Sequence, residues 1–258
     1  MIKELIPFLI IGMISATPTK LTAAPLASAL EKPLKSSDYF SFSITPDQDS
    51  VQFQASDING KLTLGGQSLK NCAADGTNWK CKPEQDLAVG ELELAVVGTP
   101  QISSVPLEVN ANNKKVLIPN IAAKPKTATV TGEIAADSDI EITLTANTAP
   151  GKAIAGSALS NYFKLGSVNL GACSETGFAS SALKDSSVSI KCKTGGKLAV
   201  SDKPYTFSLQ DAANKGSVES LTIATFGDVT VSAAAATTEN NGKFLNLSIL
   251  FFAFSILF

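Results

Sequence analysis

Several side chains that most often carry enzyme chemistry are missing from this sequence. Its 258 residues include no histidine, and every one of the 21 basic residues is lysine. A serine or cysteine nucleophile activated by an imidazole therefore cannot exist, and neither can a zinc site that uses histidine. Bidentate guanidinium recognition of phosphate or guanine is excluded too. The net charge of −2 gives no electrostatic indication of nucleic-acid binding.

Carboxylates are the remaining candidates for metal binding or catalysis. An Asp-x-Asp pair occurs twice, as Asp47 with Asp49 and as Asp137 with Asp139. Either pair could share a Ca²⁺ ion, which takes roughly six to eight oxygen ligands. No EF-hand pattern surrounds them, and solvated turn residues beside a strand are the simpler interpretation. Because the sequence has no nucleophile elbow, phosphate loop or metal motif, we expect no catalytic or cofactor-binding residues and no cofactor.

Two stretches of the chain align without a gap. Residues 62–72 (LTLGGQSLKNC) match residues 163–173 (FKLGSVNLGAC), which superimposes Cys72 on Cys173. Lys-Cys-Lys then surrounds both Cys81 and Cys192, and Leu-Ala-Val follows in both copies. Because these matches occur in the same order in both stretches, they predict two copies of one domain. The two Asp-x-Asp pairs would then be equivalent, and the proline-containing stretch 119–126 would be a stiff linker.

The repeat also bears on the disulfides. Four cysteines allow three connectivities, and equivalent cysteines favour pairing inside each copy, Cys72 with Cys81 and Cys173 with Cys192. Bridges between the copies and free thiols are the alternatives. Export would make oxidation the normal state of these cysteines, and each bridge would then stabilise its domain by roughly 2–4 kcal/mol.

Apolar and polar residues alternate through both copies, which is typical of half-buried strands. Examples are Phe40, Phe42 and Ile44 in the first copy, and turn signals such as Asn59-Gly60 separate the runs. The pattern predicts an all-β fold of two tandem immunoglobulin-like β-sandwich domains, each with one local disulfide. We expect an N-terminal extension at 17–35 and β-sandwich repeats at 36–122 and 123–231, with at most one helical turn, within 153–159.

Both ends of the chain indicate export. Residues 1–16 combine Lys3, a ten-residue apolar run and small residues, as in a secretory signal peptide; a buried N-terminal strand or helix is the alternative. Residues 244–258 are uncharged and apolar except for Asn246, Ser248 and Ser255, and residues 232–243 are small or polar. This layout resembles that of precursors of GPI-anchored surface proteins. The resemblance implies removal of the tail and a lipid anchor on Ser232, Asn240 or Asn241; a membrane-spanning tail or a core element is the alternative.

Two aromatic residues are candidates for contact with a partner. Trp79, the single tryptophan, lies between Cys72 and Cys81, and Phe178 occupies the corresponding stretch of the second copy. A rigid ring on a tethered loop offers a large contact area to a glycan or a protein at low entropic cost. Alternatively, Trp79 covers the disulfide and the end of the core.

The sequence therefore predicts a non-enzymatic protein on the outer leaflet of the plasma membrane, reached through the secretory pathway. We expect a lipid-anchored protein with a structural coat or adhesion role and an extracellular protein or glycan as partner. A carbohydrate- or ligand-binding receptor ectodomain is the alternative, and a surface hydrolase using carboxylates is the second alternative.

Overall fold

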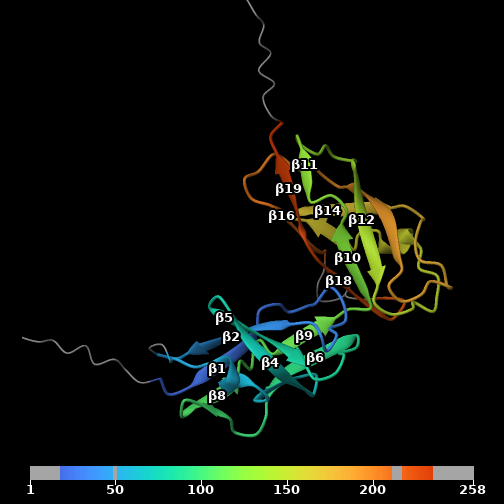
Figure 1. The fold of residues 1–258 in the computed structure, drawn as a ribbon. Helices are drawn as coiled ribbons and strands as arrows, with labels where there is room; N and C mark the ends of the chain where they lie inside the picture. Colours follow the sequence, from blue (N-terminus) through green and yellow to red (C-terminus); the bar gives the residue numbers. More distant parts are fainter. Residues whose placement is uncertain (1–17, 49–50, 211–216, 235–258) are drawn as a thin grey trace, which may run out of the picture.

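The computed structural model describes residues 18–48, 51–210 and 217–234, which form two β domains in succession along the chain (Figure 1). Within these ranges no helix is both long and apolar enough to cross a membrane. The expected signal peptide, the apolar tail, Asn240, Asn241 and Asp49 lie outside the described residues.

The first domain has two layers of strands. One layer runs in the order β1 (Leu21–Pro25), β2 (Phe40–Pro46), β5 (Asn78–Pro83) and β4 (Gln67–Asp75). The other runs in the order β3 (Leu62–Leu64), β6 (Gly90–Val96) and β9 (Lys115–Ile118). A hairpin of β7 (Gln101–Ile102) and β8 (Val105–Val109) joins the first layer, because β8 pairs in parallel with β1. Four strands facing three in this order is the immunoglobulin-like arrangement.

The two layers enclose one apolar core. The sheet folds back on itself so that β6 lies beside β8, although the two strands stand far apart in the order of hydrogen-bonded neighbours. Along β2, Phe40, Phe42 and Ile44 are buried, and the serines between them are more exposed. The alternation predicted from the sequence therefore fixes which face of each strand enters the core.

The second domain repeats this order. Its layers are β10 (Ile121–Pro125), β12 (Asp139–Ala146), β15 (Ser187–Thr194) and β14 (Val168–Cys173), and β13 (Phe163–Leu165), β16 (Tyr205–Leu209) and β19 (Asp228–Ser232). The hairpin β17 (Ser217–Val218) and β18 (Leu221–Thr225) matches β7 and β8, and β11 (Thr129–Thr131) is an added strand on β19. A short turn precedes the third strand in each copy, α1 (Ala55–Ile58) and η1 (Gly156–Leu159). Only the second turn was expected.

The predicted disulfides and the predicted fold class are confirmed. Cys72 is bonded to Cys81 and Cys173 to Cys192, with Cα atoms 4.1 and 4.0 Å apart. Each bridge joins neighbouring strands of one layer, β4 to β5 and β14 to β15. In both copies a side chain 13 residues earlier, Asn59 or Ser160, accepts a 2.9 Å hydrogen bond from the backbone N–H of the first cysteine.

Two details of the chain organisation differ from the expectation. Residues 21–25, expected in an extension, form β1, whose Leu21 and Ala23 are fully buried in the first core. The expected linker 119–126 is mostly β10, so only Pro119 and Asn120 separate the last strand of one domain from the first of the next. The prolines did mark the boundary between the domains, but Pro125 is buried within β10 and belongs to no linker.

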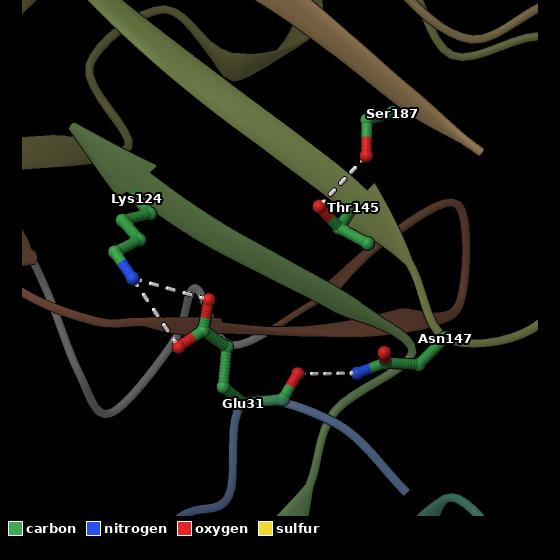
Figure 2. A network of polar contacts seen from close by, with 5 residues as sticks. All are labelled: Glu31, Lys124, Thr145, Asn147 and Ser187. Atoms are coloured by element: carbon green, nitrogen blue, oxygen red, sulfur yellow. Dashed lines mark hydrogen bonds and ion pairs between the residues drawn. The ribbon is translucent and has the colours of Figure 1, made fainter. Parts of the chain in front are cut away.

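A small polar network holds this junction (Figure 2). Asn147 is 2% exposed, and its Nδ2 donates to the carbonyl oxygens of Glu31 and Pro119, both at 2.9 Å. The Lys124 ammonium lies 3.4 Å from the Glu31 carboxylate. Asn147 thereby connects the second domain to the first domain and to the two residues between them. An amide is required here, because two carbonyl oxygens need two donors.

We predict that Asn147→Asp loosens the junction, because a carboxylate accepts hydrogen bonds only and would face two carbonyl oxygens. The loss should be about 1–3 kcal/mol or more in unfolding free energy. Small-angle scattering should show a broader range of domain arrangements. Thr145→Val is the matched control, since it removes the 2.9 Å Thr145–Ser187 hydrogen bond inside the second domain only. Identical scattering from Asn147→Asp and the wild type would contradict the prediction.

Candidate functional site

The structure places Asp47 and Asp139, two of the aspartates proposed as calcium ligands, at opposite ends of equivalent strands. Asp47 follows the end of β2, where its carboxylate accepts hydrogen bonds from the Thr19 and Lys20 backbone N–H groups at 2.9 and 3.2 Å and from the Thr19 hydroxyl. Asp139 starts β12 and forms a 2.6 Å ion pair with Lys193. The strand registers pair Phe40 with Cys81 and Ile140 with Cys192, so the two Asp-x-Asp pairs are not equivalent positions.

The correct counterpart of Asp47 is Asn147, which occupies the same place after β12. Each donates its backbone N–H to the residue just before the first strand, Asp47 to Lys20 and Asn147 to Asn120. Asp137, the other acidic candidate, lies in a turn with a left-handed φ of 60°. Among the described residues, no three acidic, cysteine or histidine side chains gather closely enough to hold a metal ion. Asp47, Asp137 and Asp139 are thus placed at turns and strand ends.

Among the described residues, every carboxylate whose pKa is shifted is shifted downwards. A hydrogen bond from Thr19 lowers the pKa of Asp47, and the Ser36 backbone N–H lowers the pKa of Asp86. Lysine partners, Lys193 and Lys126, lower the pKa values of Asp139 and Glu141. These groups are held in the ionised form, whereas a general acid at neutral pH needs a raised pKa.

Trp79 lies at the start of β5 and is partly buried against the first core. Its ring stacks on Phe53, with centroids 5.0 Å apart and an interplanar angle of 25°. The sequence interpretation that Trp79 covers the end of the core therefore holds in part. Phe53, which sequence reasoning missed, lies in the irregular segment before α1 and is also only partly buried.

A shallow groove of about 420 Å³ runs beside the Phe53 ring. Its lining residues are Gln52, Phe53, Gln54 and Asp57. Both glutamines are exposed, and the Asp57 carboxylate accepts a 2.8 Å hydrogen bond from the Gln54 backbone N–H, which fixes the start of α1. The groove thus offers two amide side chains and a carboxylate around an aromatic ring that Trp79 supports from behind.

The second domain closes the equivalent position. Register and spacing place Ile190 where the first domain has Trp79, and Ile154 where it has Phe53. Both isoleucines are buried, at 0% and 2% exposure. Phe178 lies in the 13-residue connection between β14 and β15 and pairs with Ile154 through two backbone hydrogen bonds of 2.8 and 2.9 Å. It is 5% exposed and belongs to the core, so Phe178 is not the contact residue that the sequence suggested.

Two glycines allow this closure. A Cβ at Gly177 would lie 1.8 Å from the Ile154 carbonyl oxygen, and one at Gly156 would lie 2.2 Å from the Thr176 carbonyl oxygen. Only glycine permits such close backbone approach. The first domain has Ala55 at the position of Gly156 and a two-residue turn in place of the 13-residue connection. Its aromatic pair therefore has no covering segment of this kind.

The polar side chains that line the groove are also absent from the equivalent positions of the second domain. The residues equivalent to the groove's Gln52, Gln54 and Asp57 are all alanine in the second domain, namely Ala153, Ala155 and Ala158. At this position, hydrogen-bonding groups and partly exposed rings thus occur together in the first domain and not in the second. The unequal cysteine spacing, 9 against 19 residues, was the sequence signal that the two loops differ.

Comparison with known proteins gives little further information. No protein family model matches the chain, and no curated protein does. Among solved structures, the chain matches the mixed-linkage glucan utilization locus protein SGBP-B of Bacteroides ovatus, in complex with a mixed-linkage heptasaccharide, at 11% identity and a TM-score of 0.27. It matches InvD of Yersinia pseudotuberculosis at 15% identity and a TM-score of 0.23. The alignments cover 82% and 84% of this chain but only 46% and 59% of theirs. Similarity at this level carries no conclusion about function.

We predict that Phe178→Ala destabilises the second domain by about 3–5 kcal/mol, because it empties a buried site in the core. Leu183→Ala is the control, since Leu183 lies in the same connection but is 73% exposed, and it should change stability by less than about 0.5 kcal/mol. Denaturant unfolding measures both. A loss below about 1 kcal/mol for Phe178→Ala would show that this ring does not seal the core.

Proposed function

We propose that the protein is an extracellular, lipid-anchored adhesive protein that binds a glycan through the groove of its first domain. The observation that carries this proposal is the difference between the two copies at one structural position. The second domain seals it with Phe178, whereas the first leaves Phe53 and Trp79 partly exposed beside Gln52, Gln54 and Asp57. A purely structural repeat would have no need for this difference.

The chemistry of the groove suits a neutral sugar. Amide side chains both donate and accept hydrogen bonds, and a carboxylate accepts them, so together they can satisfy hydroxyl groups. The negative face of an aromatic ring attracts the C–H groups of a sugar ring. A few polar groups around an apolar surface are the usual composition of a small-ligand site. Because the groove is shallow, it fits part of a chain better than an enclosed small molecule.

Two further observations support an extracellular and non-enzymatic role. Both disulfides form within their domains, and such bridges persist mainly in oxidising compartments. Lowered carboxylate pKa values, as at Asp139 and Glu141, favour ion pairing over proton transfer. The proposed role is therefore binding.

The lipid anchor is part of the proposal and rests on the layout of the C-terminal sequence. Of the three candidate attachment residues, Ser232 ends β19, and its carbonyl oxygen accepts a 2.8 Å hydrogen bond from the Gly132 N–H. Cleavage at Ser232 would therefore end the chain at the last residue of a core strand. Attachment at Asn240 or Asn241 instead leaves several residues between β19 and the anchor, and it is the form of the proposal that we favour.

We predict that a phosphatidylinositol-specific phospholipase C releases the mature protein from cells that express the full chain and make GPI anchors. The released protein should lack the peptide 244–258 by mass spectrometry and end at Asn240 or Asn241 with its anchor remnant. A version truncated before residue 244 is the control, and it should be secreted without treatment. Retention of the protein on the membrane with the peptide 244–258 intact would contradict the lipid anchor.

We predict that cells displaying the full chain bind a subset of neutral oligosaccharides on a glycan array. The double variant Gln52→Ala/Gln54→Ala copies the second domain and should weaken binding by about tenfold, through loss of roughly 0.5–1.5 kcal/mol per hydrogen bond. It keeps the hydrogen bond from the Gln54 backbone N–H to the Asp57 carboxylate but removes the Gln54 side chain from the capping box at the start of α1. The matched control Ala153→Gln/Ala155→Gln places the same amides on the second domain and should bind as wild type does. Absence of any specific glycan signal would instead support a passive coat role.

A further inference from the structure

A second hollow lies at the junction of the two domains. It has a volume of about 510 Å³ and is lined by residues 32–35 and 86–89 of the first domain and by residues 147–148 and 184–185 of the second. Domain interfaces are a common location for ligand sites, because two surfaces converge there. This interdomain cleft shares no lining residue with the groove beside Phe53.

The cleft collects lysines whose ammonium groups form no ion pair or hydrogen bond with another described residue. Most described lysines form an ion pair or a hydrogen bond through the ammonium group, or lie over an aromatic ring. The described lysines that do none of these are Lys32, Lys35, Lys164, Lys184, Lys191 and Lys203. Half of this set, Lys32, Lys35 and Lys184, lines the interdomain cleft. They come from both domains.

The negative groups of the cleft do not neutralise these lysines by direct contact. Asp86 accepts a 2.7 Å hydrogen bond from the Ser36 backbone N–H, and Lys35 and Lys184 are close enough to help to lower its pKa. Asp185 also faces the cleft, and its carboxylate accepts no hydrogen bond from another described residue. The Oδ1 atom of Asn147 is likewise without a donor among the described residues, because only its Nδ2 is engaged.

The cleft is held in a fixed shape. Asp185, with a left-handed φ of 65°, donates its backbone N–H to the Ala146 carbonyl at 2.7 Å, and the Ser186 carbonyl accepts from Ala146 at 2.9 Å. These bonds hold Lys184 and Asp185 beside Asn147, which is itself bonded to the first domain. On the opposite side, Leu34 and Leu87 form a bridge between their backbones and are buried below the cleft.

We propose that the interdomain cleft binds an acidic saccharide. Its carboxylate or sulfate group lies among the ammonium groups of Lys32, Lys35 and Lys184, where three positive charges face one small volume. Its hydroxyl groups donate to the Asp185 carboxylate and to the Asn147 Oδ1. Apolar residues such as Val89 contact its less polar face. The three lysines explain the preference for an acid, and the two free acceptors explain the preference for a saccharide over a bare anion.

The test titrates the full chain, solubilised in detergent, with four probes in a calorimeter. The probes are a disaccharide containing a uronic acid, a sulfated disaccharide, a neutral disaccharide and inorganic sulfate. The variant Lys32→Gln/Lys35→Gln/Lys184→Gln removes the three cleft charges. The matched control is Lys164→Gln/Lys191→Gln/Lys203→Gln, which makes the same change in net charge with unpaired lysines elsewhere.

We expect an acidic disaccharide to bind the wild type, with an affinity that falls as salt is added. The cleft variant should lose about tenfold in affinity, since three exposed charge contacts contribute up to about 1 kcal/mol each. The control variant should stay within about twofold of the wild type. Equal losses in both variants, or no binding of either acidic disaccharide, would overturn the proposal. Equally tight binding of inorganic sulfate would reduce the cleft to a simple anion site and overturn the saccharide assignment.

This site and the groove of the first domain are tested separately. The groove variant Gln52→Ala/Gln54→Ala leaves every lining residue of the interdomain cleft unchanged. It should therefore bind the acidic disaccharide as the wild type does, even where neutral oligosaccharides no longer bind. Loss of acidic binding in this variant would show that the ligand lies in the groove and not between the domains.

Discussion

The antiparallel pairing of β2 with β5, repeated by β12 with β15, is the interaction on which the rest of each domain depends. It places Phe40 opposite Cys81, and Ile140 opposite Cys192, on the inner face of the sheet. With this register, each disulfide joins two neighbouring strands of one layer, β4 to β5 or β14 to β15. The same register turns Trp79 or Ile190 toward the core. A shift by one residue would turn every one of these side chains to the other face.

The connection that follows the first cysteine makes the two copies different. In the first domain it is a two-residue turn, and the aromatic pair beside it stays partly exposed. In the second it is a 13-residue segment that inserts Phe178 into the core and then carries Lys184 and Asp185 to the domain junction. One insertion therefore closes one surface and builds part of another. The groove and the interdomain cleft are both consequences of this unequal loop length.

The junction between the domains gives these surfaces a fixed relation. Two residues are too few for free rotation of one domain against the other, and the Asn147 amide engages the carbonyl oxygen of Glu31 in the first domain and that of Pro119 in the connection. Such a buried amide is favourable only while its donors remain paired. The exposed Lys124–Glu31 ion pair adds little by itself at 52% exposure of both side chains. Asn147 is therefore the residue that holds the interdomain cleft open in one shape.

The sequence by itself determined the strands, the repeat and the disulfide pairing. A period of two along Phe40, Phe42 and Ile44 is local information, and it survives folding because one face of each strand must leave water. The disulfide pairing is local information too, because the two cysteines of each pair lie close together in one copy of the repeat. The predicted equivalence of the two Asp-x-Asp pairs was wrong, because similar residues beside a strand do not show whether they precede or follow it.

Only the tertiary structure decided which of these residues are available to a ligand. Trp79 and Phe178 look alike as aromatic residues after a cysteine, yet one is partly exposed and the other is 5% exposed. The difference depends on backbone contacts of Gly156 and Gly177 with residues some twenty positions away. Lys32 and Lys184 line the same interdomain cleft although they lie 152 positions apart in the sequence. Contacts of this range are set by how two layers and two domains pack, and no short pattern in the chain records them.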